Sequence, residues 1–593
     1  MKSGHHRRGG VRFFCACLLL FGSVGLLQAE ELKEIARLAK GGAAELALAL
    51  LDEQQPEYVA ESGQWLRWER MRVRILEQRG QWQALEQRLA HLPEGVPADF
   101  SRWAQGRRAR ALVLNRQPVQ ARQILRRLLW SGEPPSSTEL AEWRQLVMQS
   151  YLQQGRVDDA YVAMLRYHQD HGEKGEEGLQ IRARILLASG HAAEARSLLD
   201  VARLDPVSTR LWWLARLRSG SPAAKLLAEI RATEGLDEQS ELVRYLHYGV
   251  MAETAQAAED TAALIIALEQ WYRLTPPLEG WDELLNLSAD SLWQGYLAYA
   301  QQLGNREQLL IGNDAAWFKL ADETDKRYPV RKHSLYAQLS RHGATQEVRE
   351  KAALELASQL QAQEGGMAVV QQLFLHSAHY PDATHLPAAV AYLLVDQAIR
   401  DGDLPMASRL LQQLPEPPDN TARFPWQLRR VKVFILAGDF TSAETLLHQL
   451  LPEIGAYGRQ QRDQLIQLLF DLQTVGEHET AYALLHEVYQ RVPDLQLRRE
   501  LLFWMADSRV AQGNHVAAAR LYLQSATLLD AQSMDPWAQT ARYKAAEALA
   551  EGGMLEDAAH LYTALLRVTE QPERRAVLRR ELEQVRMRQA GDR

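Results

Sequence analysis

The sequence predicts an all-α protein, a superhelical α-solenoid of antiparallel helix hairpins with about two dozen helices. Three observations support this class. A short motif of a glycine, a small residue and a large apolar residue recurs along the chain at a nearly fixed spacing. The stretches between the motifs carry apolar residues at helical spacing. No stretch of any length alternates between apolar and polar residues as a strand would.

The motif is clearest in the C-terminal third. Gly513 is followed five residues later by Ala518 and nine residues later by Tyr522. The same arrangement occurs at Gly438 with Ala443 and Leu447, at Gly476 with Ala481 and Leu485, and at Gly553 with Ala558 and Tyr562. These four glycines are 38, 37 and 40 residues apart, and a constant period of this size indicates a repeat array.

One repeat can be interpreted physically. Residues 501–510 have the apolar spacing of a helix, and Gly513 follows where a helix end needs a left-handed residue. A second helix is expected from about residue 516 to 529. The small Ala518 lets the two helices approach closely, and Tyr522 reaches the neighbouring hairpin. A single hairpin cannot bury its apolar face alone, so successive hairpins must stack.

This pattern resembles the tetratricopeptide repeat (TPR), a helix-turn-helix unit of about 34 residues. Gly476, Ala481 and Pro493 match the turn, small and terminal positions of that family, and Gly155 and Ala160 match two of them. The family's Trp is mostly missing here, and the periods are long. The resemblance implies a long binding surface that serves partner proteins or glycans.

Residues 1–29 are expected to form a secretory signal peptide. A basic start is followed by an apolar run from residue 13 to 27, about 15 residues and therefore short for a membrane span. Cleavage is expected after Ala29, and Ser23-Val24-Gly25 is an alternative site. No later stretch is apolar enough to cross a bilayer, so we expect the mature chain not to span a membrane.

Three regions follow the signal. Residues 30–220 contain TPR-like repeats, with motif glycines at Gly155 (before Ala160) and Gly190 (before Ala195), and with Arg116 standing in the glycine place of one copy. Residues 221–400 form an irregular helical middle in which Gly304 with Leu309 is one recognisable copy. Residues 401–593 return to the repeat phase and end in an Arg-rich capping helix over 572–590.

Charge and cysteine content exclude several function classes. The formal net charge is −7. Residues 1–29 contain four basic residues and no acid, so the mature chain carries −11. This balance argues against nucleic acid as a partner. Cys15 and Cys17 both lie in the signal, so disulfides, thiolate metal sites, iron-sulfur clusters and covalent haem are not expected after it.

No catalytic, cofactor-binding or metal residue is predicted. The sequence lacks a zinc-protease motif, a phosphate-binding loop, a dinucleotide fingerprint and a nucleophile elbow. His376, His379, Asp382 and His385 could supply imidazole and carboxylate ligands to zinc or copper. We favour the interpretation that these histidines simply lie at the end of a hairpin.

Two groups of residues are candidates for partner binding. Eight arginines and no acid occur between residues 102 and 127, flanked by Trp103 and Trp130; the arginines are Arg102, Arg107, Arg108, Arg110, Arg116, Arg122, Arg126 and Arg127. Arginine suits bidentate capture of carboxylate or phosphate. The favoured alternative is a solvated helix face paired with acids from neighbouring repeats. Our candidates within the run are Arg102, Arg107, Arg108 and Arg110.

The second group is aromatic and lies in the irregular middle: Trp271, Trp281, Trp293 and Tyr296. Such side chains can stack on sugar rings or anchor a peptide, and they can also fill gaps between helices, which we favour.

These observations predict a non-catalytic scaffold or adaptor of the periplasm or cell envelope that binds partner proteins in a solenoid groove. Association with the outer membrane stays open. The alternative is a glycan-handling accessory of exopolysaccharide export or peptidoglycan remodelling. The expected partners are envelope proteins, with anionic glycan or lipid as the second possibility and nucleic acid excluded.

Overall fold

The structure is a computed structural model that describes residues 32–130, 134–171, 176–200, 204–277, 281, 284–325, 327–418 and 420–591. The predicted signal peptide, residues 1–29, lies outside these residues. No helix in the described ranges is long and apolar enough to cross a membrane.

The described residues contain 30 labelled α-helices, α2 to α31, and no β-strand. The prediction of an all-α solenoid built from helix hairpins is therefore confirmed. The count exceeds the estimate of about two dozen helices made from the motif period. The irregular middle accounts for part of the difference, since it includes short helices such as α16 and α17 that carry no complete motif.

The helices up to Asn305 are α2 (Ala44–Gln54), α3 (Ser62–Gln78), α4 (Trp82–Ala90), α5 (Ala98–Leu114), α6 (Pro118–Trp130), α7 (Ser137–Leu152), α8 (Val157–His171), α9 (Glu176–Ala188), α10 (Ala192–Leu199), α11 (Pro206–Arg218), α12 (Ala223–Arg231), α13 (Glu241–Ala257), α14 (Thr261–Tyr272) and α15 (Ala289–Leu303). The next group is α16 (Arg306–Leu310), α17 (Asp314–Glu323), α18 (Pro329–His342), α19 (Gln346–Gln361) and α20 (Gly366–Leu375).

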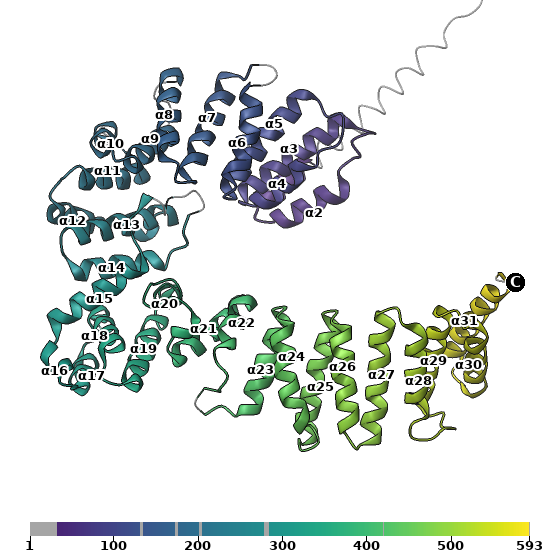
Figure 1. The fold of residues 1–593 in the computed structure, drawn as a ribbon. Coiled ribbons are helices and arrows are strands. Elements are labelled where there is room, and N and C mark those ends of the chain that lie inside the picture. Colours follow the sequence, from purple (N-terminus) through teal and green to yellow (C-terminus); the bar gives the residue numbers. More distant parts are fainter. Residues whose placement is uncertain are drawn as a thin grey trace, which may run out of the picture. The chain divides into compact units, whose positions relative to one another are not determined.

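The remaining α-helices are α21 (Ala388–Asp401), α22 (Leu404–Gln412), α23 (Arg423–Leu436), α24 (Phe440–Leu450), α25 (Arg459–Thr474), α26 (His478–Arg491), α27 (Leu495–Ala511), α28 (His515–Thr527), α29 (Pro536–Glu551), α30 (Leu555–Val568) and α31 (Pro572–Gly591). Short 3-10 helices are η1 (Leu236–Glu238), η3 (Ala383–His385) and η4 (Leu451–Glu453). Figure 1 shows α23 to α28 side by side.

The motif glycine is the turn of each hairpin. Gly513 has φ +75°, its N–H donates to the Val510 carbonyl at 2.9 Å, and the Asn514 N–H donates to the Arg509 carbonyl at 2.8 Å. These two bonds close the end of α27 with a left-handed residue, which a side chain would oppose. Positive φ is also found at the other predicted turn glycines, Gly155, Gly190, Gly438, Gly476 and Gly553.

The small residue of the motif lies where the second helix of each hairpin meets the first. The predicted alanines are all 0% exposed: Ala160, Ala195, Ala443, Ala481, Ala518 and Ala558. The large residue four positions later is buried as well, as Tyr522 and Tyr562 show. Packing at this position therefore leaves no room for a larger side chain.

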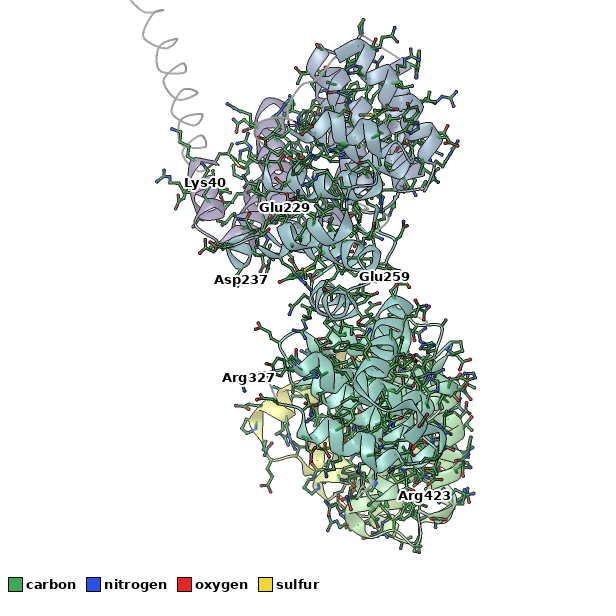
Figure 2. The ribbon with its side chains drawn as sticks, turned by 90° about the vertical axis from the view of Figure 1, so that its left-hand side faces the viewer. Lys40, Glu229, Asp237, Glu259, Arg327 and Arg423 are labelled. Atoms are coloured by element: carbon green, nitrogen blue, oxygen red, sulfur yellow. The ribbon has the colours of Figure 1, made fainter. Side chains whose placement is uncertain are left out.

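The irregular middle also contains left-handed turns, but these turns lack the complete sequence motif. Glu259, labelled in Figure 2, has φ +57° between α13 and α14, and Leu264 occupies the small position. Gly312 has φ +77° and is followed by the buried Trp317. The assignment of Gly304 as a turn glycine was wrong, because its φ is −109° in an extended conformation.

The chain divides into two compact units. The first holds the residues up to Asn305 together with 320–335 and 360–373, and the second holds 306–319, 336–359 and 374–593. The boundaries predicted at residues 220 and 400 follow repeat regularity instead of packing, and they stay predictions. In the second unit α31 packs on α30, with Leu578, Leu582 and Val585 buried, as a capping helix would.

Candidate partner-binding groove

A groove of about 750 Å³ lies over α6, α7 and α8, all within the first unit. Helices α6 and α8 are the second helices of two successive hairpins, and α7 is the first helix of the later hairpin. The groove therefore forms where one hairpin stacks on the next. We call this site the α6–α8 groove.

Helical periodicity explains which residues reach the groove. On α6 they include Val119, Arg122, Arg126 and Trp130, spaced by three or four residues along one face. The opposite face of α6 carries its buried residues, Ala121, Ile124 and Leu125. The helix begins with Pro118, which suits a first helical position.

The other two helices add matching faces. Helix α7 contributes Leu140, Arg144 and Tyr151, and α8 contributes Val162 and Arg166. Helix α7 begins with a capping box in which Ser136 Oγ accepts from the Glu139 N–H and the Glu139 carboxylate accepts from the Ser136 N–H. This cap sets where α7 starts and so which of its residues face the groove.

The groove is strongly basic. Four of its side chains are arginines, and Asp159 is its one acid. Asp159 is engaged with Arg156 at 2.7 Å, and Arg144 pairs with Asp170. The exposed Arg126 and Arg166 have no ion pair within the described residues.

Burial and neighbouring arginines lower the pKa of two of the groove arginines. Burial lowers the pKa of Arg122, and the nearby Arg156 lowers it further, while Tyr151 and Asp159 act in the opposite direction. Burial also lowers the pKa of Arg144, with Arg166 as the second cause. Arginine stays charged at neutral pH in any case. The groove therefore holds like charges whose mutual repulsion an incoming anion would relieve.

Apolar and aromatic side chains lie beside these charges. Trp130 is 74% exposed and Val162 is 65% exposed, both large values for such residues. The Arg166 guanidinium carbon lies 5.9 Å from the centre of the Trp130 ring. The Tyr151 ring is contacted by two guanidinium groups, from Arg122 at 4.5 Å and Arg156 at 5.3 Å. The groove thus combines positive charge with exposed apolar surface.

The arginines predicted as binding residues have a different role. Each pairs with a glutamate of a neighbouring helix: Arg102 with Glu139 at 3.8 Å, Arg107 with Glu77 and Glu142 at 3.5 Å, Arg108 with Glu86 at 2.8 Å, and Arg110 with Glu142 at 3.9 Å. These glutamates belong to α3, α4 and α7, so the pairs link α5 to the elements on either side. A binding role for these four residues is therefore not supported.

The predicted aromatic residues are core residues. Trp271, Trp281, Trp293 and Tyr296 are 7%, 2%, 0% and 0% exposed. The Trp293 Nε1–H donates to the Leu373 carbonyl at 3.0 Å, and the Tyr296 hydroxyl donates to Glu269 at 2.8 Å. The sugar-stacking interpretation of these side chains is wrong, because their rings are enclosed by neighbouring helices.

Two residues of the histidine cluster, Asp382 and His385, interact with each other locally. Asp382 accepts from the Thr384 N–H at 2.8 Å and so caps η3, and its carboxylate lies 2.8 Å from Nδ1 of His385. Within the described residues no group of three or more His, Cys, Asp or Glu side chains could hold a metal ion.

Part of the groove lies in the arginine run of the sequence, and the rest lies outside it. Arg122, Arg126 and Trp130 belong to the arginine run and its flank, but Arg144 and Arg166 lie in later helices. The sequence signal for the groove residues of α6 and α8 is their spacing by three or four positions, which places them on one face of each helix. Which faces adjoin depends on hairpin stacking, which the sequence pattern does not specify.

No family model matches the chain, and no curated protein matches it. The crystal structure of the pentatricopeptide repeat protein PPR10 in complex with an 18-nt psaJ RNA element is similar over 98% of this chain and 96% of that chain, with 15% identity and a TM-score of 0.28. The crystal structure of yeast Tom70 is similar over 83% of this chain and 97% of that chain, with 12% identity and a TM-score of 0.21.

Both TM-scores are low, so the fold assignment rests on the hairpins, turn glycines and buried alanines described above. The chain folds as a TPR-like α-solenoid. A solenoid of this kind offers a long surface for binding other macromolecules.

Proposed function

We propose that the protein is a non-catalytic scaffold of the cell envelope that binds a partner protein in the α6–α8 groove. The observation that carries the proposal is the pair Arg126 and Arg166, exposed and without an ion pair in the described residues, beside the exposed Trp130. On a chain with a net charge of −7, a groove with four arginines and one acid is a local reversal of charge. Such a reversal favours a specific anionic partner.

The groove is better suited to binding than to chemistry. Its lining residues are Val, Arg, Gln, Leu, Trp, Tyr, Asp and Ala, which include no Ser, Thr, Cys, His or Lys. The lining therefore supplies no Ser, Thr or Cys nucleophile paired with a base, the usual arrangement in covalent catalysis, and its one carboxylate, Asp159, is paired with Arg156.

The periplasmic location in this proposal rests on the sequence. A basic segment, an apolar run of about 15 residues and small residues near Ala29 are typical of an export signal. Mass spectrometry of the protein recovered from an envelope fraction should find its N-terminus near Glu30 or just after Gly25. An intact Met1 in the membrane pellet would contradict export by cleavage.

The glycan-handling alternative has less support at the residue level. The aromatic side chains that could have stacked on sugars, Trp281 and Trp293 among them, are buried. We therefore retain the protein-binding scaffold as the proposal.

The test is affinity capture from envelope extracts with the full mature chain. The variant R126E/R166E reverses both free charges, and R423E/R459E is the matched control, since Arg423 and Arg459 are exposed arginines of the second unit. We expect the groove variant to lose specific capture and the control to retain it. Equal capture by both variants would overturn the proposal.

A further inference from the structure

We infer that the occupant of the α6–α8 groove is an acidic, extended segment of a protein that also places an apolar side chain against Trp130. This inference rests on the proposed function, because it names the chemistry of the partner at the same site. Three features of the groove support it: its length, its charge and its exposed apolar surface.

The length suits a short extended peptide. The groove residues of α6 run from Val119 to Trp130, which are eleven positions apart and therefore separated by roughly 16 Å at a rise of about 1.5 Å per residue. An extended chain covers about 3.3 Å per residue, so roughly five residues span this length. A segment of that size would contact groove residues of α6, α7 and α8.

The positive charge of the groove favours carboxylates as its ligands. Arg126 and Arg166 are exposed on opposite helices of the groove, and a planar guanidinium matches a carboxylate with two parallel hydrogen bonds. The single acid of the groove, Asp159, is occupied by Arg156. Two acidic side chains of a bound segment would therefore meet two guanidinium groups that have no competing ion pair in the described structure.

The apolar surface requires a second kind of contact. Val119, Trp130 and Val162 are all exposed and all line this one groove. Exposed apolar patches bordered by charge are typical of protein-binding sites, and Trp and Arg are the residues most often found at their energetic centres. An apolar side chain of the segment would cover Trp130 and exclude water from the arginine pairs.

Glycans and single-stranded nucleic acids fit the groove less well. Both bind largely by stacking successive rings on open aromatic faces, and the groove offers one such face, Trp130, because two guanidinium groups already lie against the Tyr151 ring. The uncharged groups here that could bond sugar hydroxyls are few: Gln123 and the Tyr151 hydroxyl supply the side-chain contacts. Most of the remaining lining is aliphatic or guanidinium, which suits a mixed acidic and apolar peptide.

The inference can be tested with synthetic probes. Three fluorescein-labelled octapeptides are compared with the full mature protein by fluorescence anisotropy: one with four Glu and two Leu, one with Gln in place of each Glu, and one with Ser in place of each Leu. We expect the peptide with Glu and Leu to bind at least about tenfold more tightly than the Gln peptide and the Ser peptide, because charge-assisted and apolar contacts both contribute. Equal binding of all three would overturn the inference.

Variants locate the binding. R126E/R166E should weaken binding of the Glu-Leu peptide by at least about tenfold and abolish the difference between the Glu and Gln peptides. W130A should instead abolish the difference between the Leu and Ser peptides. R423E/R459E is the control that should bind like the wild type. R126Q/R166Q, with circular dichroism to confirm folding, covers the case in which charge reversal prevents folding.

Competition separates this inference from the proposed function. Groove-dependent capture of a partner that excess Glu-Leu peptide fails to displace would overturn the acidic-segment inference and leave the scaffold proposal standing. Displacement by polygalacturonate but not by the peptide would assign the groove to an anionic glycan and overturn the inference. Absence of any groove-dependent capture would overturn the scaffold proposal itself.

Discussion

Nδ1 of His333 lies 2.8 Å from Oε1 of Glu269, although the two residues are 64 positions apart and both side chains are buried. The Tyr296 hydroxyl donates to the same oxygen at 2.8 Å, and Arg273 approaches the second carboxylate oxygen at 3.5 Å. This cluster joins α14, α15 and α18 within the first unit. A buried carboxylate with several donors is stable only while those donors remain.

Tyr296→Phe should therefore destabilise the irregular middle by about 1–3 kcal/mol, because it removes one donor and leaves Glu269 less well satisfied. Hydrogen exchange of peptides from α14 and α15 measures the effect. The same change in a Glu269→Leu background should cost much less, since the acceptor is already gone. Equal costs in the two backgrounds would show that the hydroxyl does not act through Glu269.

The stability of α13 should depend on pH through His247. Burial, with a contribution from Arg210, lowers the pKa of His247 to about 4. The imidazole packs against Trp213 and Tyr248. An unfolded histidine titrates near pH 6.5, so between pH 6.5 and 4 the unfolded chain binds the additional proton. The stabilisation is complete above pH 6.5 and is lost as the pH falls, by at most about 3 kcal/mol.

Hydrogen exchange of α13 peptides in the wild type and in His247→Phe, followed from pH 7 to pH 4.5 with correction for the intrinsic exchange rate, provides the measurement. The wild type should lose protection over this range more steeply than the variant. His560→Phe, at an exposed position, is the control and should keep the wild-type slope. If protection falls with pH equally steeply in the variant and the wild type, His247 is not the source of the pH dependence.

Ala481→Leu should overpack one hairpin. Ala481 is 0% exposed in α26, and added methyl groups in a packed site typically cost about 1–3 kcal/mol. Each hairpin contacts mainly its neighbours, so hydrogen exchange should increase near residues 438–530 and change little around Gly155. Ala483→Leu, on the exposed face of the same helix, should have almost no effect. Uniform loss of protection along the chain would contradict the local picture.

Glu259→Gly should stabilise the hairpin of α13 and α14. Glu259 has φ +57°, a conformation that costs a residue with a Cβ about 1–2 kcal/mol and glycine almost nothing, while glycine adds entropy to the unfolded chain. The net gain should be about 0.5–1 kcal/mol. The neighbouring Ala258 has φ −87°, so Ala258→Gly should destabilise by a similar amount. The difference between the two variants, measured by hydrogen exchange of α13 and α14, tests the backbone argument.

Several features of this protein follow from the sequence by itself. The period of the motif, the turns at Gly438, Gly476 and Gly513, and the buried position of Ala518 depend on neighbours within about ten residues. Local conformation and the size of one side chain set them, so the pattern reports them directly. Glu259 shows the limit: Arg116, which also has positive φ, was still recognisable from Ala121 five residues later, whereas Glu259 is followed at that distance by the large Leu264.

Only the tertiary structure decided which arginines are available to a partner. Arg107 and Arg108 differ from Arg126 in nothing that the sequence displays, yet glutamates of adjoining helices neutralise the first two and leave the third exposed. The stacking of hairpins also brought Arg166 to the groove and enclosed Trp293. Pairing and burial depend on contacts between residues tens of positions apart, and a local periodic pattern carries no information about those distances.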